Sequence, residues 1–177
     1  PSAYPSVFSP RANIVYKYSD FTIMKASYGE AFRAPNFIEL YADFTIAEGI
    51  LYFKGDPNLK PERIQTTEFN ISHIFSRNVS MNVNLFNIES DDILILVVEK
   101  IESGVLANAY IDEYKNLSRA TVTGGEAALK CKLSSSADAT ISYAYQNARN
   151  PDSNSQLGLA PNNKASLRLN IDLGART

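Results

Sequence analysis

Apolar and polar residues alternate one by one along many segments of this chain. In Ser166–Leu173, leucine or isoleucine occupies every odd-numbered position, whereas serine, arginine, asparagine and aspartate occupy the even-numbered ones. Val79–Leu85 repeats the pattern, with valine, methionine and leucine alternating with serine and asparagine. Because successive side chains of a β-strand point to opposite faces of the sheet, each such segment is predicted to be a strand with one apolar and one polar face.

The same pattern recurs along the whole chain and predicts an all-β protein. The expected strands, about seven in number, are Ala12–Tyr18, Phe21–Tyr28, Glu68–Phe75, Val79–Leu85, Glu126–Leu133, Ala139–Gln146 and Ser166–Leu173. No segment has a convincing helical period, so no helix is expected.

The predicted connections alternate between short and long. They are, in turn, Ser19–Asp20, Ala34–Arg63, Ser76–Asn78, about Asp91–Asn108, Ser134–Asp138 and Asn150–Asn162. In an up-and-down antiparallel sheet, this alternation places the short turns at one rim and the long loops at the other. Transmembrane β-barrels have this asymmetry, and their strands turn an apolar face toward lipid. The pattern therefore favours an antiparallel transmembrane β-barrel over a soluble β-sandwich, with membrane lipid in contact with the apolar face.

The number of strands suggests that the barrel is larger than this chain. Bacterial single-chain barrels have an even number of strands, so a set of about seven does not close one. An open sheet of this length would leave two exposed edges, which promote aggregation. The chain also begins at Pro1 rather than at an initiator methionine. We therefore expect residues 1–177 to be a consecutive part of a barrel domain.

The composition argues against several other classes of protein. Lys and Arg total 17 against 19 Asp and Glu, a balance that does not suggest a nucleic-acid partner. With one cysteine, Cys131, and one histidine, His73, the sequence offers neither an internal disulfide nor a cysteine or multi-histidine metal cluster. The carboxylates at positions 91, 92, 112 and 113 lack the spacing of a metal-binding loop. Since the sequence also lacks a phosphate-binding glycine loop and a Ser/His/Asp set, we expect no enzyme, no cofactor and no bound metal.

Several irregular segments resemble those of one protein family. The string YGEAFRAPNFIELY at Tyr28–Tyr41, then GDPNLKPER at Gly55–Arg63 and TTEFNIS at Thr66–Ser72, resembles the C-terminal half of the barrel in TonB-dependent outer-membrane receptors. The pieces NVNLFNIESDDIL, YKNLSRATVTGGEAAL and LAPNNKASLRL are similar to later parts of that barrel, in the same order and spacing. Asp56 stands where the family more often has asparagine, and Gly125 where valine is common.

The resemblance implies a barrel of about 22 strands in the outer membrane of a Gram-negative bacterium. It implies TonB-dependent active uptake of a scarce nutrient, first of all a ferric siderophore, with cobalamin or haem as alternatives. The family's plug domain and terminal strand are expected to be absent from residues 1–177, so the TonB complex would act through a plug elsewhere in the full-length protein. Ala34–Gly55 contains no histidine, which disfavours haem capture through a histidine in this loop. A passive porin and a β-rich, adhesin-like surface protein are the competing interpretations.

The loop residues divide into two predicted groups. A loop-scaffold role is expected, because proline restricts the backbone and Asp and Asn favour turns, for Phe32, Arg33, Pro35, Asn36, Asp56, Pro57, Asn58, Leu59, Pro61 and Glu62. Arg33 is expected to pair with a loop carboxylate, with contact to an anionic substrate as the alternative. Aromatic side chains stack on planar ligands, so the expected substrate-binding residues are Tyr41, Phe44, Tyr52, Phe53 and Arg33. For the four aromatic residues, packing of the loop against itself is the alternative interpretation.

Aromatic residues are also expected at the two membrane interfaces. Barrels carry belts of aromatic side chains there, and the candidates are Tyr16, Tyr18, Phe75, Tyr143 and Tyr145. His73 lies between Ile71 and Phe75 on the apolar face, so it is expected at the lipid interface or the rim rather than at a metal.

Overall fold

The computed structural model describes residues 7–46, 51–100, 110–158 and 161–172. The chain forms two compact units, each made of several segments. The first comprises residues 1–9, 30–64 and 90–120, and we call it the loop unit. The second comprises residues 10–29, 65–89 and 121–177, and we call it the wall unit.

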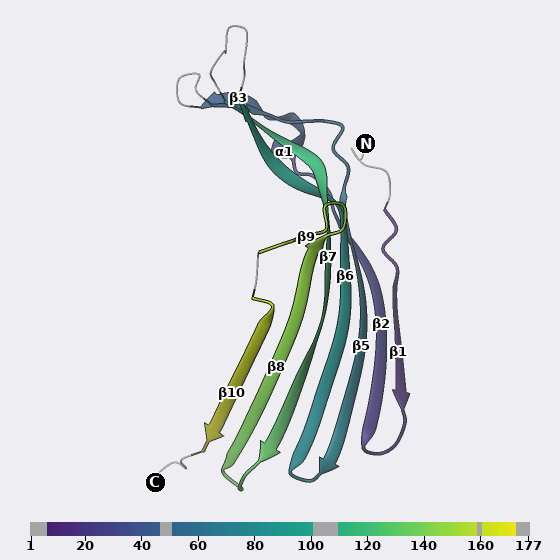
Figure 1. The fold of residues 1–177 in the computed structure, drawn as a ribbon. Helices are drawn as coiled ribbons and strands as arrows, with labels where there is room; N and C mark the ends of the chain where they lie inside the picture. Colours follow the sequence, from purple (N-terminus) through teal and green to yellow (C-terminus); the bar gives the residue numbers. More distant parts are fainter. Residues whose placement is uncertain (1–6, 47–50, 101–109, 159–160, 173–177) are drawn as a thin grey trace, which may run out of the picture. The chain divides into compact units, whose positions relative to one another are not determined.

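Seven long strands make up most of the structure. They are β1 (Arg11–Lys17), β2 (Thr22–Arg33), β5 (Glu62–Ser76), β6 (Val79–Lys100), β7 (Tyr110–Lys132), β8 (Ala137–Asn150) and β10 (Asn163–Ile171). Each pairs with the next one along the chain, in the order β1-β2-β5-β6-β7-β8-β10 (Figure 1). All of the predicted strands are therefore present. Within the described part of the chain, this series of long strands ends at β1 on one side and at β10 on the other, so the sheet is unclosed, as expected for part of a barrel.

The wall unit has its short turns at one end (Figure 1). These turns, at residues 18–21, 77–78 and 133–136, agree with the predicted short connections. The connection between β8 and β10 lies at the other end of this unit and contains the two-residue strand β9, Ser155–Gln156, which pairs with the end of β8. Within the wall unit, turn length is thus sorted by end in the way that transmembrane barrels require.

The two faces of the wall unit differ in polarity as the alternation predicts. On one face, Ile141 of β8 lies between Leu129 of β7 and Leu167 of β10. On the other face, Ser142 and Ser166 lie side by side with their hydroxyl oxygens 2.7 Å apart. Leu167 is 73% exposed and Ile141 is 56% exposed. Apolar side chains this open over a whole sheet face indicate a surface that a non-aqueous medium covers.

The aromatic residues expected at the membrane interfaces all lie exposed on the wall unit. Tyr16, Tyr18 and Phe75 are close to the short turns, whereas Tyr143 and Tyr145 are further along β8. These positions fit two separate belts. His73, on the same face as Phe75, has its Nδ1 2.8 Å from the Thr22 hydroxyl and packs edge-on against the Phe75 ring.

The loop unit contains three short elements between β2 and β5. They are α1 (Phe37–Tyr41), β3 (Asp43–Ile46) and β4 (Leu51–Lys54). The strands β3 and β4 form an antiparallel hairpin, and β4 pairs in parallel with the start of β7, Leu51 beside Tyr110 and Lys54 beside Glu113. Among the described residues, no helix is both long and apolar enough to cross a membrane.

Two expectations about the loops were wrong. The absence of any helix is contradicted by α1, whose five residues are too few to produce a helical period in the sequence. The long connection expected from about Asp91 begins later, because β6 continues through the apolar run ILILVV to Lys100 and β7 begins at Tyr110. The rest of that predicted loop, residues 101–108, lies outside the described residues.

Candidate functional site

The helix α1 begins at a capping box built from Asn36 and Glu39. The Asn36 side chain accepts a hydrogen bond from the Glu39 amide at 2.9 Å, and the Glu39 carboxylate accepts one from the Asn36 amide at 2.7 Å. Pro35, just before, favours extended geometry for Ala34. Since a single helical turn is marginal by itself, α1 depends on the contacts that surround it.

Arg33 supplies the strongest of these contacts. Its Nη1 lies 3.1 Å from Glu39, whose side chain is 6% exposed, and its Nε lies 2.5 Å from Glu62. A buried carboxylate is costly unless a charged partner meets it. The hydrogen bond to Glu62 raises the pKa of Arg33, and the hydrogen bond from Arg33 holds the pKa of Glu62 below its ordinary value. Arg33 therefore joins the start of α1 to the start of β5.

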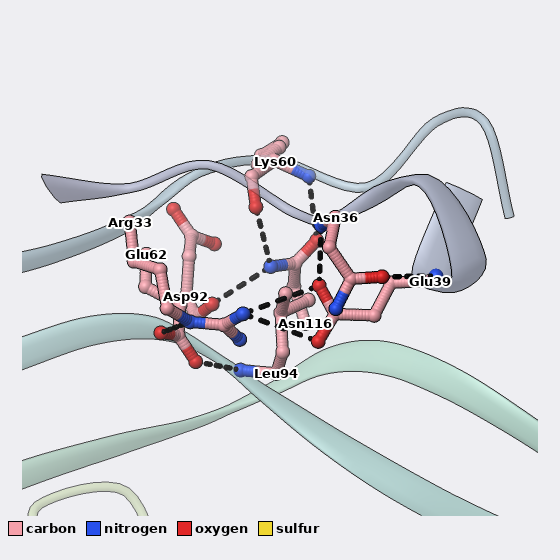
Figure 2. A network of polar contacts seen from close by, with 8 residues as sticks. All are labelled: Arg33, Asn36, Glu39, Lys60, Glu62, Asp92, Leu94 and Asn116. Carbon is pink, nitrogen blue, oxygen red and sulfur yellow. Dashed lines mark hydrogen bonds and ion pairs between the residues drawn. The ribbon is translucent and has the colours of Figure 1, made fainter.

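Glu62 and Asn116 extend these contacts to β6 and β7 (Figure 2). The second oxygen of Glu62 accepts a hydrogen bond from the Leu94 amide at 2.7 Å. The Asn116 side chain accepts from the Lys60 amide at 2.8 Å and donates to the carbonyls of Lys60 and Asp92 at 3.0 and 2.7 Å. Asp92 has φ 54°, a left-handed conformation that few residues other than glycine adopt. We call the eight residues drawn in Figure 2 the polar network; they are Arg33, Asn36, Glu39, Lys60, Glu62, Asp92, Leu94 and Asn116.

A second set of contacts connects the turn at Asp56 to the helix α1. The Asp56 carboxylate accepts from the Asn58 amide at 2.8 Å, which forms the turn expected of this sequence. The amides of Gly55 and Asp56 donate to the carbonyls of Ala42 and Glu39 at 2.7 and 3.0 Å. A Cβ on Gly55 would lie 2.5 Å from a backbone nitrogen of α1, so only glycine fits this close approach. Leu59 is buried.

The aromatic residues of the loop unit pair with each other. The rings of Phe44 and Phe53 are stacked, with centroids 5.4 Å apart, and Tyr114 meets Phe53 edge-on at 6.0 Å. The rings of Phe37 and Tyr41 are tilted, 5.2 Å apart, and both remain more than half exposed.

The hydroxyl of Tyr52 is engaged within the hairpin. It donates to Asp43 at 2.6 Å, which raises its pKa. The hydrogen bond runs between residues of β3 and β4, so it ties the two strands of the hairpin together.

The structure thus divides the residues proposed from the sequence. It brings Arg33, Asn36 and Glu62 together in the polar network, and it holds Arg33 between two carboxylates. Phe44 and Phe53 pack on each other, whereas Tyr41 pairs with Phe37. Phe32, Tyr41 and Phe44 are exposed. The described residues contain no group of three or more histidine, cysteine or acidic side chains arranged to hold a metal.

Sequence reasoning missed Glu39, Asn116 and Phe37. For Glu39 there was a signal, because an acidic residue three positions after Asn36 is the spacing of a capping box. For Asn116 there was none, since its partner Lys60 lies 56 positions away.

Taken together, consecutive long antiparallel strands with one exposed apolar face and short turns at one end of the wall unit define the wall of an outer-membrane β-barrel. The chain belongs to the TonB-dependent receptor-like β-barrel family, whose model matches residues 1–176. It is therefore an outer-membrane protein segment.

Related proteins carry names that concern iron or siderophores. The chain is 24% identical over 155 residues to the iron-regulated outer membrane virulence protein of Vibrio cholerae serotype O1, covering 85% of this chain and 24% of that protein. The solved structure of the Pseudomonas aeruginosa ferric enterobactin receptor PfeA, as a Q482A mutant with enterobactin, has a TM-score of 0.75 at 20% identity, covering 94% of this chain and 26% of that one. The P. aeruginosa siderophore receptor PirA has a TM-score of 0.69 at 19% identity, covering 84% and 31%. The chain thus spans about a quarter of the length of the curated relative.

Proposed function

We propose that the receptor containing this chain imports a ferric siderophore in a TonB-dependent manner. The observation that carries the proposal is membership of the receptor family together with exposed, paired aromatic side chains on a tightly pinned loop unit. The names of the V. cholerae relative and of the P. aeruginosa receptors support iron as the nutrient. Coupling to the TonB complex would pass through a plug domain of the full-length protein.

Within this proposal, the two groups of loop residues have separate roles. Arg33, Asn36, Glu62 and their partners form the scaffold, because their charges and hydrogen bonds are spent on each other rather than left for a ligand. Tyr41 and Phe44 offer exposed ring faces for a planar or aromatic part of the substrate. Phe53 supports Phe44 from behind, and Tyr52 braces the hairpin through Asp43.

Binding measurements on the full-length receptor test the assignment. Ferric siderophores of several chemical types, haem and cobalamin would be titrated separately, and a ferric siderophore is expected to bind tightest. Equal indifference to all of these ligands would overturn the proposed function. Tightest binding of haem or cobalamin would keep the family role and replace the substrate.

The role of Tyr41 is tested by Tyr41→Ala. Loss of one aromatic contact is expected to weaken siderophore binding about three- to tenfold, since such contacts are worth roughly 0.5–1.5 kcal/mol. Tyr18→Ala, which removes an exposed tyrosine of the wall unit, serves as the matched control and should leave the affinity unchanged. Unaltered affinity in Tyr41→Ala would remove this residue from the proposed binding surface.

A further inference from the structure

A groove of about 490 Å³ runs along the apolar face of the wall unit. Most of its lining is apolar and comes from Val83, Leu85, Gly125, Ala127, Tyr143 and Tyr145, and Gly124 and Glu126 of β7 also border it. The floor is β7, where Gly125 and Ala127 lie opposite Tyr145 and Tyr143 of β8. Leu85 of β6 leans over Gly125 so closely that a Cβ there would lie 2.7 Å from a Leu85 methyl carbon. The groove therefore has a floor of small residues between an aliphatic wall and an aromatic wall.

The aromatic wall is held in a fixed position. The Tyr143 hydroxyl donates a hydrogen bond to the Asn163 side chain of β10 at 2.5 Å. This bond ties the ring toward β10 and away from the groove floor, which keeps the groove open.

The groove changes from apolar to polar at the end that lies away from the short turns. Thr123 and Asn147 line it there, and the Thr123 hydroxyl donates to Asn87 at 2.8 Å. Two residues further along β8, Arg149 lies opposite Thr121. Its guanidinium contacts the amide oxygens of Asn147 and Asn154 at 3.2 and 3.4 Å. Neutral oxygens of this kind orient a guanidinium without cancelling its charge.

We propose that this groove binds one acyl chain of a phosphorylated glycolipid of the outer leaflet, with a phosphate of the same lipid at Arg149. The apolar face is already the lipid-facing surface of the barrel, so the occupant of a groove in it is a lipid chain. Along β8 the side chains change from apolar to polar to charged, from the Tyr143 and Tyr145 rings through Asn147 to Arg149. An amphiphilic molecule has the same order of apolar, polar and charged parts. Arginine pairs well with phosphate because its planar fork meets two oxygens at once.

The position of the polar end selects the outer leaflet. From the start of β8 at Ala137 to Tyr145 the strand rises about 26 Å at ~3.3 Å per residue, which becomes roughly 20 Å across the membrane after a tilt of about 40°. This span is close to the apolar band of about 25 Å that such barrels present. Short turns face the periplasm in these barrels, so Asn147 and Arg149 lie at the external boundary, where lipopolysaccharide carries the phosphates of its lipid A.

Two carboxylates near the groove repel a phosphate. Glu126 borders the β7 floor of the groove, five residues along β7 from Thr121, which lies opposite Arg149. Glu89 of β6 accepts a hydrogen bond from Asn87 at 2.8 Å and carries the same sign of charge as a phosphate. The phosphate is therefore expected on the β8 side of the groove, beside Arg149.

Native mass spectrometry of the purified, delipidated full-length receptor tests the proposal. The receptor would be titrated with lipid A and, separately, with phosphatidylglycerol. Ala127→Leu fills the floor and is expected to weaken lipid A binding about tenfold, the loss produced by expelling roughly two methylene groups. Arg149→Gln is expected to weaken it about fivefold, the usual contribution of one basic residue near an anionic lipid.

Two matched variants serve as controls. Ala139→Leu enlarges an alanine of the same apolar face outside the groove, and Arg77→Gln removes an arginine at a short turn. Both should bind lipid A like the unaltered receptor. If Ala127→Leu assembles poorly, Ala127→Val replaces it, with a smaller expected loss.

Three outcomes would overturn the proposal. These are binding of phosphatidylglycerol as tight as that of lipid A, equal losses in the control variants, and no loss in either groove variant. The siderophore affinity of all four variants is expected to be unchanged, so the result is independent of the proposed uptake function.

Discussion

Different kinds of interaction stabilise the loop unit and the wall unit, each considered by itself. In the loop unit, Leu40 and Leu59 are buried, and the buried Glu39 meets Arg33. Among the described residues of the wall unit, none of the apolar side chains is buried, and the strands are joined by backbone ladders such as that of β7 and β8. The wall unit has no core of its own because lipid replaces it. The stability of the loop unit depends on the identity of individual residues, whereas that of the wall unit depends mainly on the polarity of each face of the sheet.

The largest effect is expected from a charge on the apolar face of the wall unit. Leu167→Lys places a charge on the apolar face of β10 opposite Ile141, near the middle of the apolar band, at an expected cost of about 2–4 kcal/mol. Ser166→Lys is the matched control, because it puts lysine one residue away on the polar face, beside Ser142. Outer-membrane assembly of the full-length receptor, measured by its heat-modifiable migration on gels, should fail only for Leu167→Lys. Normal assembly of that variant would contradict the lipid-facing assignment.

The next largest effect is expected from the loss of a specific ion pair in the loop unit. Arg33→Ala removes the charged partner of the buried Glu39 and is expected to destabilise the loop unit by about 2–3 kcal/mol, at the low end for such pairs because Arg33 is itself 46% exposed. Limited proteolysis of the assembled receptor should then cut within residues 34–61 much faster. Arg63→Ala removes a neighbouring exposed arginine and should leave the cutting rate unchanged. Equal cutting in both variants would show that Arg33 is dispensable for the loop.

A smaller effect is expected at Asn116. Asn116→Ala leaves the Lys60 amide and the Lys60 and Asp92 carbonyls without this partner, at an expected cost of about 1–2 kcal/mol. Asn116→Asp keeps the acceptor for the Lys60 amide but loses both donated bonds. Protection of the Lys60 amide in this variant should therefore lie between that of the unaltered receptor and that of Asn116→Ala. Hydrogen exchange of the Lys60 amide is the direct measurement, and unchanged protection in Asn116→Ala would contradict the role of this side chain.

The smallest effect concerns pH. Because the folded-state pKa of Glu62 is lowered, its carboxylate contributes stability that is fully present above the ordinary glutamate value of about 4.3 and is lost as pH falls through the lower folded value. The protection factor of the Leu94 amide, which donates to Glu62, should stay high at pH 5 and fall once the pH drops below the ordinary glutamate value of about 4.3. Glu62→Gln should remove this pH dependence while leaving the wall unit unaffected.

The sequence predicts the wall unit far better than the loop unit, for a physical reason. The alternation in Ser166–Leu173 exists because lipid on one side and polar surroundings on the other act on every residue of β10. The helix α1 has no comparable period in its five residues, and the hairpin of β3 and β4 is recognisable only through its partner β7. Arg33 was expected to meet a loop carboxylate, but the choice of Glu39 and Glu62 depends on contacts across the fold. Its place beside both is a property of the folded loop, not of any local pattern.

The pairing of β4 with β7 also has a consequence for the order of events during folding. Among the described residues between β2 and β5, β4 pairs not with either of those flanking strands but with Tyr110–Glu113, more than fifty positions further along the chain. This segment therefore reaches its final arrangement only after β5, β6 and the start of β7 are available. Contacts between such distant parts of a chain form slowly. The surface proposed to meet the substrate is expected to be among the last parts of this chain to mature, after the strands on either side of it.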